Sequence, residues 1–265
     1  MSETTWSQPN PPFPTMQERL RSTAFAVAPL LALYVLYTLV RFFVRDRGPL
    51  YGTMNALEVI HFEKRFGFFW EPAIQGEVLA HDHLIKLANL YYSYGFLPVL
   101  VLTALIAAWR MPAVFKRWRT VFVISLALAS IGYTLFPLTP PRMVTGFGFV
   151  DTLALLGPHY YGDETGKSLF NAYGSLPSLV NVYAAMPSMH VAWSVIVGQL
   201  LMRIFPGRRW VRMIGWLHPV AMATAVVVTA NHYLLDIIVG LLVLLVAIGV
   251  GSKWARIPML RRLPI

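Results

Sequence analysis

The chain contains no cysteine among its 265 residues, and only 13% of its residues are charged. Without thiols, the sequence excludes disulfide bonds, cysteine nucleophiles and cysteine-ligated metal sites. Hydrophobic residues make up 57% of the chain, and the mean hydropathy is +0.57. Because soluble domains carry roughly 25% charged residues, this composition indicates a membrane protein.

Six apolar segments have about the 17 to 25 residues that a helix needs to cross a bilayer. They cover residues 22–43, 90–109, 119–137, 187–206, 213–231 and 233–252. A seventh segment, residues 54–75, is too charged to cross and too apolar to be a loop, which predicts a helix in the membrane interface. We therefore predict an all-α, polytopic membrane protein with six transmembrane helices and an additional interfacial helix.

The basic residues are distributed unevenly along the chain. If the N-terminus is cytoplasmic, 14 of the 22 Lys and Arg residues fall in cytoplasmic segments, together with only two of the 12 acidic residues, Glu3 and Glu18. This bias follows the positive-inside rule. It predicts a multi-pass protein of the cell membrane with both termini in the cytoplasm and the 138–186 loop on the extracytoplasmic side. The net charge of +10 thus reflects topology and gives no reason to expect a nucleic-acid partner.

The chain has no internal repeat, so a single membrane domain over residues 22–252 is the simplest organisation, and it holds all the candidate catalytic residues. Residues 1–21 are polar and proline-rich, which predicts a flexible cytoplasmic N-terminus, and residues 253–265 form a basic cytoplasmic tail. The glycine-rich segment 145–183 is a long loop of the kind that often serves as a lid or binding segment.

Three polar motifs lie where predicted helices meet the extracytoplasmic surface: PLTPPRM (137–143), AAMPSMHVAW (184–193) and ANHYLLD (230–236). In the third motif, His232 and Asp236 are four residues apart, which places them on one face of a helix. The carboxylate would bind one ring nitrogen of His232 and leave the other bare and more basic, as in a catalytic triad. A purely structural aspartate is the alternative, although an unpaired carboxylate in a membrane is costly.

The other two motifs offer groups that suit an anion. Pro187 fits the first position of a helix, so that Ser188 and the free N–H groups would face an anion at the positive end of the helix dipole, with His190 on the same turn. Arg142 follows two prolines that stop the preceding helix, and its guanidinium is suited to phosphate oxygens. An ordinary helix start and an arginine that reaches lipid headgroups are the alternatives.

Two histidines, a carboxylate, an arginine and a helix N-terminus together favour displacement at phosphorus. One histidine would attack the phosphorus atom and form a phosphohistidine, and the other would protonate the departing oxygen and then activate the acceptor. Arg142 and the amides of the helix would stabilise the charge on the phosphoryl oxygens.

These residues resemble the type 2 phosphatidic acid phosphatase superfamily over about residues 85–250, with PSMH similar to its second motif and HYLLD to its third. The resemblance implies a helical bundle with a six-helix core and catalysis without a metal or other cofactor. It also implies residue roles: His232 as nucleophile, Asp236 as its orienting partner, His190 as general acid and base, and Ser188 and Arg142 as phosphate ligands.

The chain departs from the phosphatases of this superfamily around the first and third motifs. Leu135 replaces a lysine and Met143 a proline near the first-motif arginine, and Ala225 and Val226 replace Ser-Arg before the third motif. In this respect the chain is similar to the branch that includes inositol phosphorylceramide synthase and sphingomyelin synthase, and PPRM, AAMPSMH and LEVIHFEKRFGFFWEP resemble bacterial relatives of that branch. A phosphate monoester carries nearly two negative charges, so a site with fewer cations suits a singly charged phosphodiester.

We therefore expect an inositolphosphotransferase-like enzyme of lipid metabolism that moves the phospho-headgroup of a phosphodiester lipid to an alcohol or water. Hydrolysis of a lipid or polyprenyl phosphate is the alternative within the same enzyme class. Four further residues are predicted to line the cavity or contact the acceptor: Asn89, Tyr92, Glu63 and Asn231. For Glu63, solvation at the interface is the simpler explanation.

Other classes remain open from the sequence. A metal enzyme would use His190, His232 and Asp236 as ligands, and an intramembrane serine protease would use Ser188 as its nucleophile. A lipid transporter or flippase would use the same polar residues to line a substrate path, and a relative that only binds lipid would not catalyse at all.

Overall fold

The computed structural model describes residues 48–155 and 183–254, together with scattered residues among the first 47. The elements of this part are helical, apart from an isolated β-bridge between Leu138 and Ala184. They are α2 (Gly48–Phe66), α3 (Glu71–Leu79), α4 (Asp82–Leu90), the π-helical turn η2 (Tyr91–Gly95), α5 (Leu97–Arg110), α6 (Pro112–Leu135), the 3₁₀ turn η3 (Pro141–Met143), α7 (Thr152–Leu155), α9 (Met189–Ile204), α10 (Arg209–Val228) and α11 (Leu234–Trp254). Apart from those scattered residues, the predicted helix 22–43 and the N-terminus 1–21 lie outside the described residues, as do residues 156–182 of the predicted loop and the tail from 255 onwards.

The segment predicted as one interfacial helix, residues 54–75, forms two helices. Gly67 ends α2 with a φ of +77°, a backbone conformation that glycine adopts readily. The N–H groups of Gly67 and Phe68 donate to the carbonyls of Lys64 and Glu63, which is the hydrogen-bond pattern of a Schellman cap. The expectation of a single helix over 54–75 was therefore wrong, because this cap ends α2 and α3 begins only at Glu71.

Four helical stretches are long and apolar enough to cross a membrane: Asp82–Arg110, Pro112–Leu135, Arg209–Val228 and Leu234–Ser252. They correspond to four of the six predicted segments. The first combines α4, η2 and α5. Helix α9 has 16 residues, fewer than the predicted segment 187–206, and is shorter than a full crossing. The chain is a membrane protein whose described part is an all-helical bundle.

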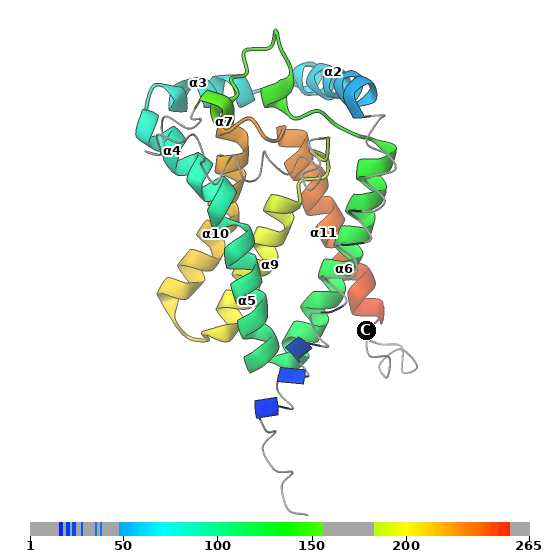
Figure 1. Ribbon diagram of the computed structural model, residues 1–265, viewed down its shortest axis with the longest axis vertical. Coiled ribbons are helices and arrows are strands. Elements are labelled where there is room, and N and C mark those ends of the chain that lie inside the picture. The colour runs from blue at the N-terminus through cyan, green and yellow to red at the C-terminus, as the bar shows by residue number, and fades with distance from the viewer. Residues whose placement is uncertain are drawn as a thin grey trace, which may run out of the picture.

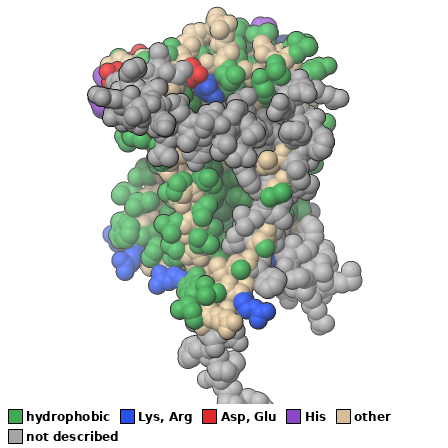
Figure 2. Space-filling view, in the orientation of Figure 1, with side chains coloured by type: hydrophobic (Ala, Val, Ile, Leu, Met, Phe, Trp, Pro, Cys, Tyr) green, Lys and Arg blue, Asp and Glu red, His purple; other side chains and the backbone are tan. Residues whose placement is uncertain are grey.

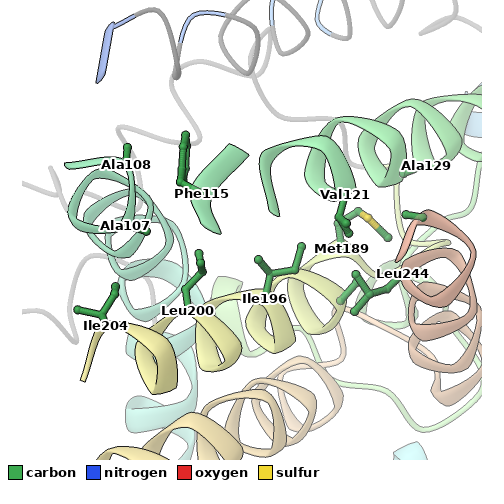
Figure 3. Close-up of a cluster of buried hydrophobic side chains, with 12 residues drawn as sticks. Ala107, Ala108, Phe115, Val121, Ala129, Met189, Ile196, Leu200, Ile204 and Leu244 are labelled. Atoms are coloured by element: carbon green, nitrogen blue, oxygen red, sulfur yellow. The ribbon is translucent and has the colours of Figure 1, made fainter. Parts of the chain in front are cut away.

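Helix α9 lies at the centre of the bundle and packs against α5, α6, α10 and α11. Figure 3 shows Met189, Ile196 and Leu200 of α9 between side chains of α5, α6 and α11. Ala107 on α5 and Leu244 on α11 are among the partners, and both are almost fully buried. This apolar cluster holds the first turn of α9, which carries His190, in a fixed position.

The contact between α9 and α10 depends on two glycines. A Cβ atom on Gly198 would overlap the carbonyl oxygen of Gly215, and both residues are buried. Small residues at such positions let two helix backbones approach closely, as is common in membrane bundles. The close approach keeps the start of α9 beside the end of α10, from which the chain continues to His232.

The two ends of the bundle differ in charge and in covering. Helices α2, α3 and α7 lie across one end, where α6 and α10 finish and α9 and α11 begin (Figure 1). Figure 2 shows acidic and histidine side chains at this end, with a basic side chain among them, whereas the charged side chains visible at the opposite end of the apolar band are basic. The basic residues of the opposite end belong to the α5–α6 and α9–α10 connections: Arg110, Lys116, Arg117, Arg203, Arg208, Arg209 and Arg212.

Candidate active site

His232 stands in the turn that joins α10 to α11. The N–H groups of Asn231 and His232 both donate to the carbonyl of Val226, at 2.9 and 3.2 Å, which folds the chain back at the end of α10. His232 is 4% exposed and Asp236 is fully buried. His232 therefore precedes the first residue of α11, whereas the sequence placed both residues on one helix.

The predicted pairing of His232 with Asp236 is present. Nδ1 of His232 lies 3.2 Å from Oδ2 of Asp236, and the same oxygen accepts a hydrogen bond of 2.9 Å from the N–H of Tyr233. In the tautomer whose Nδ1 donates to this carboxylate, Nε2 carries the lone pair, and the imidazole also forms a hydrogen bond with the backbone of Ala185. Burial lowers the pKa of His232 to about 4, so the imidazole is neutral at physiological pH.

His190, in the first turn of α9, faces the free nitrogen of His232. Its Nδ1 lies 3.2 Å from Nε2 of His232. Two aromatic rings from the η2 region pack against the other side of the His190 ring, with centroid distances of 5.0 Å for Tyr92 and 4.7 Å for Phe96. The structure thus brings together two predicted site histidines that are 42 residues apart in the chain, and it places Tyr92 beside them.

Ser188 is the N-cap residue of α9 and is fully buried. The helix begins at Met189, so Pro187 lies before the N-cap, and the expectation that Pro187 occupies the first helical position was wrong. The N–H of Ser188 donates to the carbonyl of Asp236 at 2.9 Å, and Gly240 packs against the backbone of Ser188. The buried hydroxyl of Ser188 has no hydrogen-bond partner within the described part of the chain.

Arg142 approaches the turn of His232 from η3, directly after Pro140 and Pro141. Its backbone N–H donates to the carbonyl of Ala230 at 2.8 Å, and its Nε donates to Oδ1 of Asn231 at 3.1 Å. The amide nitrogen of Asn231 donates to Oγ1 of Thr229 at 2.8 Å, which fixes the orientation of the amide. Arg142 and the predicted cavity residue Asn231 are therefore held directly beside His232.

Glu63 and Glu71 hold the start of α11. Oε1 of Glu71 accepts a hydrogen bond of 2.7 Å from the N–H of Leu234, and Oε1 of Glu63 accepts one of 2.8 Å from the N–H of Leu235. Both glutamates are fully buried. The explanation of Glu63 by interfacial solvation was wrong, because a carboxyl group placed at a helix N-terminus satisfies N–H groups that have no partner inside the helix.

Glu71 also affects the ionisation of Glu63. Burial, a hydrogen bond to Glu71 and the charge of Glu71 raise the pKa of Glu63 from its usual 4.5 to about 9. An acid whose pKa is raised by folding stabilises the native state at low pH, and this contribution is lost as the pH rises through the folded pKa. Glu63 is therefore protonated at neutral pH, and its ionisation destabilises the folded protein.

We expect Glu63→Gln to flatten the pH dependence of stability. The amide oxygen can still accept the hydrogen bond from Leu235 but cannot ionise, so the loss of stability that the wild-type protein shows between pH 4.5 and about 9 should largely disappear. Thermal unfolding in detergent across this range measures the effect. Glu58→Gln, which changes an exposed glutamate on the same helix, is the matched control. Equal pH profiles for wild type and Glu63→Gln would contradict the assignment.

Asn89 and Gln75 occupy fully buried positions at the same end of the bundle. Oδ1 of Asn89 accepts a hydrogen bond of 3.2 Å from Thr152, so Asn89 contacts the start of α7. Gln75, which sequence reasoning missed, bonds to both backbone groups of Val150 and donates to the carbonyl of Val228 at 3.1 Å. It therefore ties α3 to the last residue of α10.

Asp151 was also missed, because it stands alone in a glycine-rich segment with no spaced partner. Its Oδ2 lies 3.0 Å from a terminal nitrogen of Arg142. As for the metal hypothesis, no three His, Asp or Glu side chains among the described residues are grouped as metal ligands. The contacts form a chain from Asp236 through His232 to His190.

The chain is similar in sequence to known proteins. Phosphoinositol dihydroceramide synthase of Bacteroides thetaiotaomicron is 27% identical over 135 residues, which are 48% of this chain and 42% of that protein. The chain thus matches less than half the length of this relative. No solved structure matches the chain significantly. The PAP2 superfamily, by contrast, matches continuously over residues 57–250, from α2 to α11. The protein therefore belongs to the PAP2 superfamily of membrane phosphatases and phosphotransferases.

Proposed function

We propose that the protein is a lipid phosphotransferase that moves the phospho-headgroup of a phosphodiester lipid through a phosphohistidine on His232. The observation that carries the proposal is the contact chain in which Asp236 binds Nδ1 of His232 and His190 faces its Nε2. A relative whose name specifies phosphoinositol transfer to a ceramide-type lipid supports this choice of reaction.

In the first half-reaction, Nε2 of His232 attacks phosphorus and the bond from phosphorus to the lipid oxygen breaks. His190, which then carries a proton, donates it to the departing oxygen, so that the lipid leaves as a neutral alcohol. In the second half-reaction, His190 removes a proton from the acceptor hydroxyl, whose oxygen attacks phosphorus and releases Nε2 of His232. Water in place of the alcohol converts the transfer into hydrolysis.

Substrate binding must separate the two histidines. Reacting atoms approach to about 3–3.5 Å before attack, and an acid lies within about 3.2 Å of the atom that it protonates. A phosphorus atom and its leaving oxygen therefore do not fit between nitrogens that are 3.2 Å apart. We expect the His190 ring to turn, because its contacts with Tyr92 and Phe96 are ring contacts, whereas His232 is hydrogen-bonded to Asp236.

The cations at the site suit a substrate with one negative charge. Arg142 lies beside His232, whereas two positions that carry cations in related phosphatases hold Leu135 and Val226. Leu135 is 78% exposed at the end of α6, and Val226 is fully buried, so neither can bind phosphate. Each missing contact to a charged group could be worth about 1.5 to 3 kcal/mol, which disfavours a doubly charged monoester.

The orientation proposed from the sequence suits such a substrate. The basic residues at the α5–α6 and α9–α10 connections mark the cytoplasmic end of the bundle by the positive-inside rule. The site then lies at the extracytoplasmic end, under α2 and α3. Exposed Leu50, Tyr51, Met54 and Phe66 make α2 suited to the membrane interface. A lipid could thus reach His232 with its tails still in the bilayer.

The test is a substrate panel with purified protein in mixed micelles. Phosphodiester lipids with different headgroups are compared with phosphatidic acid and a polyprenyl phosphate, with ceramide, diacylglycerol or water as acceptor, and products are identified by mass spectrometry. We expect release or transfer of a phospho-headgroup from at least one diester. Turnover of monoesters alone would replace the proposal with a lipid or polyprenyl phosphate phosphatase. Lipid movement across vesicles without any turnover would favour a transporter.

A further inference from the structure

Asp151 is tied to the site by two side-chain contacts described here and by the anchoring of its neighbour Val150, none of which the reaction steps above use. Its Oδ1 accepts a hydrogen bond of 3.1 Å from the N–H of Leu153, and thereby caps α7. Its Oδ2 lies 3.0 Å from a terminal nitrogen of Arg142. The preceding residue, Val150, is held at both backbone groups by the buried side chain of Gln75. The carboxylate is thus fixed beside the guanidinium by its neighbours on both sides.

Capping α7 requires only one of the two carboxylate oxygens of Asp151. Serine or asparagine would satisfy the N–H of Leu153 equally well at an N-cap. The second oxygen instead places a full negative charge against Arg142, whose Nε already binds Asn231. Both side chains keep some exposure, 18% for Arg142 and 30% for Asp151, so a ligand can approach the guanidinium while the pair remains intact.

We propose that Asp151 is a specificity-determining residue that restricts the phosphate site to singly charged phosphodiesters. The proposal rests on the proposed function and concerns the same site. A carboxylate next to the arginine cancels much of the attraction that the guanidinium exerts on an anion. It also repels a bound phosphate in proportion to the charge of that phosphate. A monoester dianion therefore loses about twice as much binding free energy as a diester monoanion. The site binds the diester in preference because of this difference.

The test compares the binding of two simple amphiphiles, dodecyl phosphate and its methyl ester, to detergent-solubilised protein. Near pH 8 the monoester carries about two negative charges because its second pKa is about 6, whereas the methyl ester carries one. Dissociation constants are measured by isothermal titration for wild type, Asp151→Asn and Asp151→Ser. Asp82→Asn, which removes an exposed carboxylate at the start of α4, is the matched control.

We expect both Asp151 variants to bind dodecyl phosphate more tightly relative to the methyl ester by about tenfold, which corresponds to about 1.4 kcal/mol. Asp82→Asn should leave this ratio unchanged. The proposal fails if both ligands change by the same factor, since that result would indicate only a structural role, or if neither changes. If the Asp151→Asn protein does not fold, Asp151→Ser decides the test, because serine retains a side-chain cap for α7.

Binding does not require turnover, so this experiment is independent of the substrate panel. An enzyme that hydrolyses only monoesters would contradict the proposed function, yet the ratio of the two dissociation constants would still respond to Asp151. Conversely, a diester transferase whose ratio is unaffected by both variants would keep its function and lose only the specificity role of Asp151.

Discussion

Replacement of His232 by alanine should lower turnover by at least about 10⁴-fold, the range seen when a nucleophile is removed from a catalytic constellation. Without Nε2 there is no atom to accept the phosphoryl group, and His190 on the far side cannot form the same bond because it lacks the Asp236 contact. Headgroup release from the best lipid of the panel measures the loss. Thermal unfolding of the variant is measured alongside, because the ring also bonds to Asp236 and to the backbone of Ala185, and the loss of these contacts should lower stability far less than it lowers turnover.

The control for this variant is His81→Ala, which removes an exposed histidine at the start of α4. The intermediate can also be sought directly. Wild-type protein mixed with a labelled diester and quenched in alkali should retain the phospho-headgroup on His232, and His232→Ala should retain none. Residual activity of His232→Ala within tenfold of wild type would rule out a covalent intermediate at this residue.

Asp236→Asn should lower kcat by roughly 10³- to 10⁴-fold, as in other sites where an amide replaces the carboxylate that orients a histidine. The asparagine oxygen can still accept the N–H of Tyr233, so the turn before α11 is retained. The amide cannot stabilise the positive charge that develops on the ring when Nε2 attacks phosphorus, and it allows the wrong tautomer.

The decisive readout for this variant is the division between kcat and KM. A residue that orients the nucleophile affects kcat and leaves KM nearly unchanged. A rise in KM with an unchanged kcat would instead make Asp236 a group that shapes substrate binding. Asp82→Asn again provides the matched control for the loss of one carboxylate.

The spacing of polar residues was enough to predict the centre of the site. His232 and Asp236 are separated by one helical turn, and this local spacing produces their contact even though His232 lies outside the helix. The meeting of His190 with His232 followed from topology, because the charge distribution placed both motifs at the same end of the bundle. The roles of these residues in the reaction stay predictions.

The parts that could not be predicted depend on contacts between distant segments. Glu63 and Glu71 lie in a stretch that mixes acidic and basic residues, and charged residues of such a stretch usually face water. Their burial is favourable because they accept hydrogen bonds from the N–H groups at the start of α11. No local sequence pattern predicts a contact between segments so far apart in the chain. The break after Phe66 was different, since Gly67 was visible in the sequence and its preference for positive φ is general.

The carboxyl caps on α11 also bear on the order in which the protein can be made. Glu71 and Glu63 accept hydrogen bonds from residues that lie 163 and 172 positions later in the chain. Because a chain is synthesised from its N-terminus and folds as it emerges, α2 and α3 are complete while their partners do not yet exist. Until α11 arrives, these glutamates must remain hydrated at the membrane surface. The turn that carries His232 therefore reaches its final geometry only after α11 has joined α2 and α3.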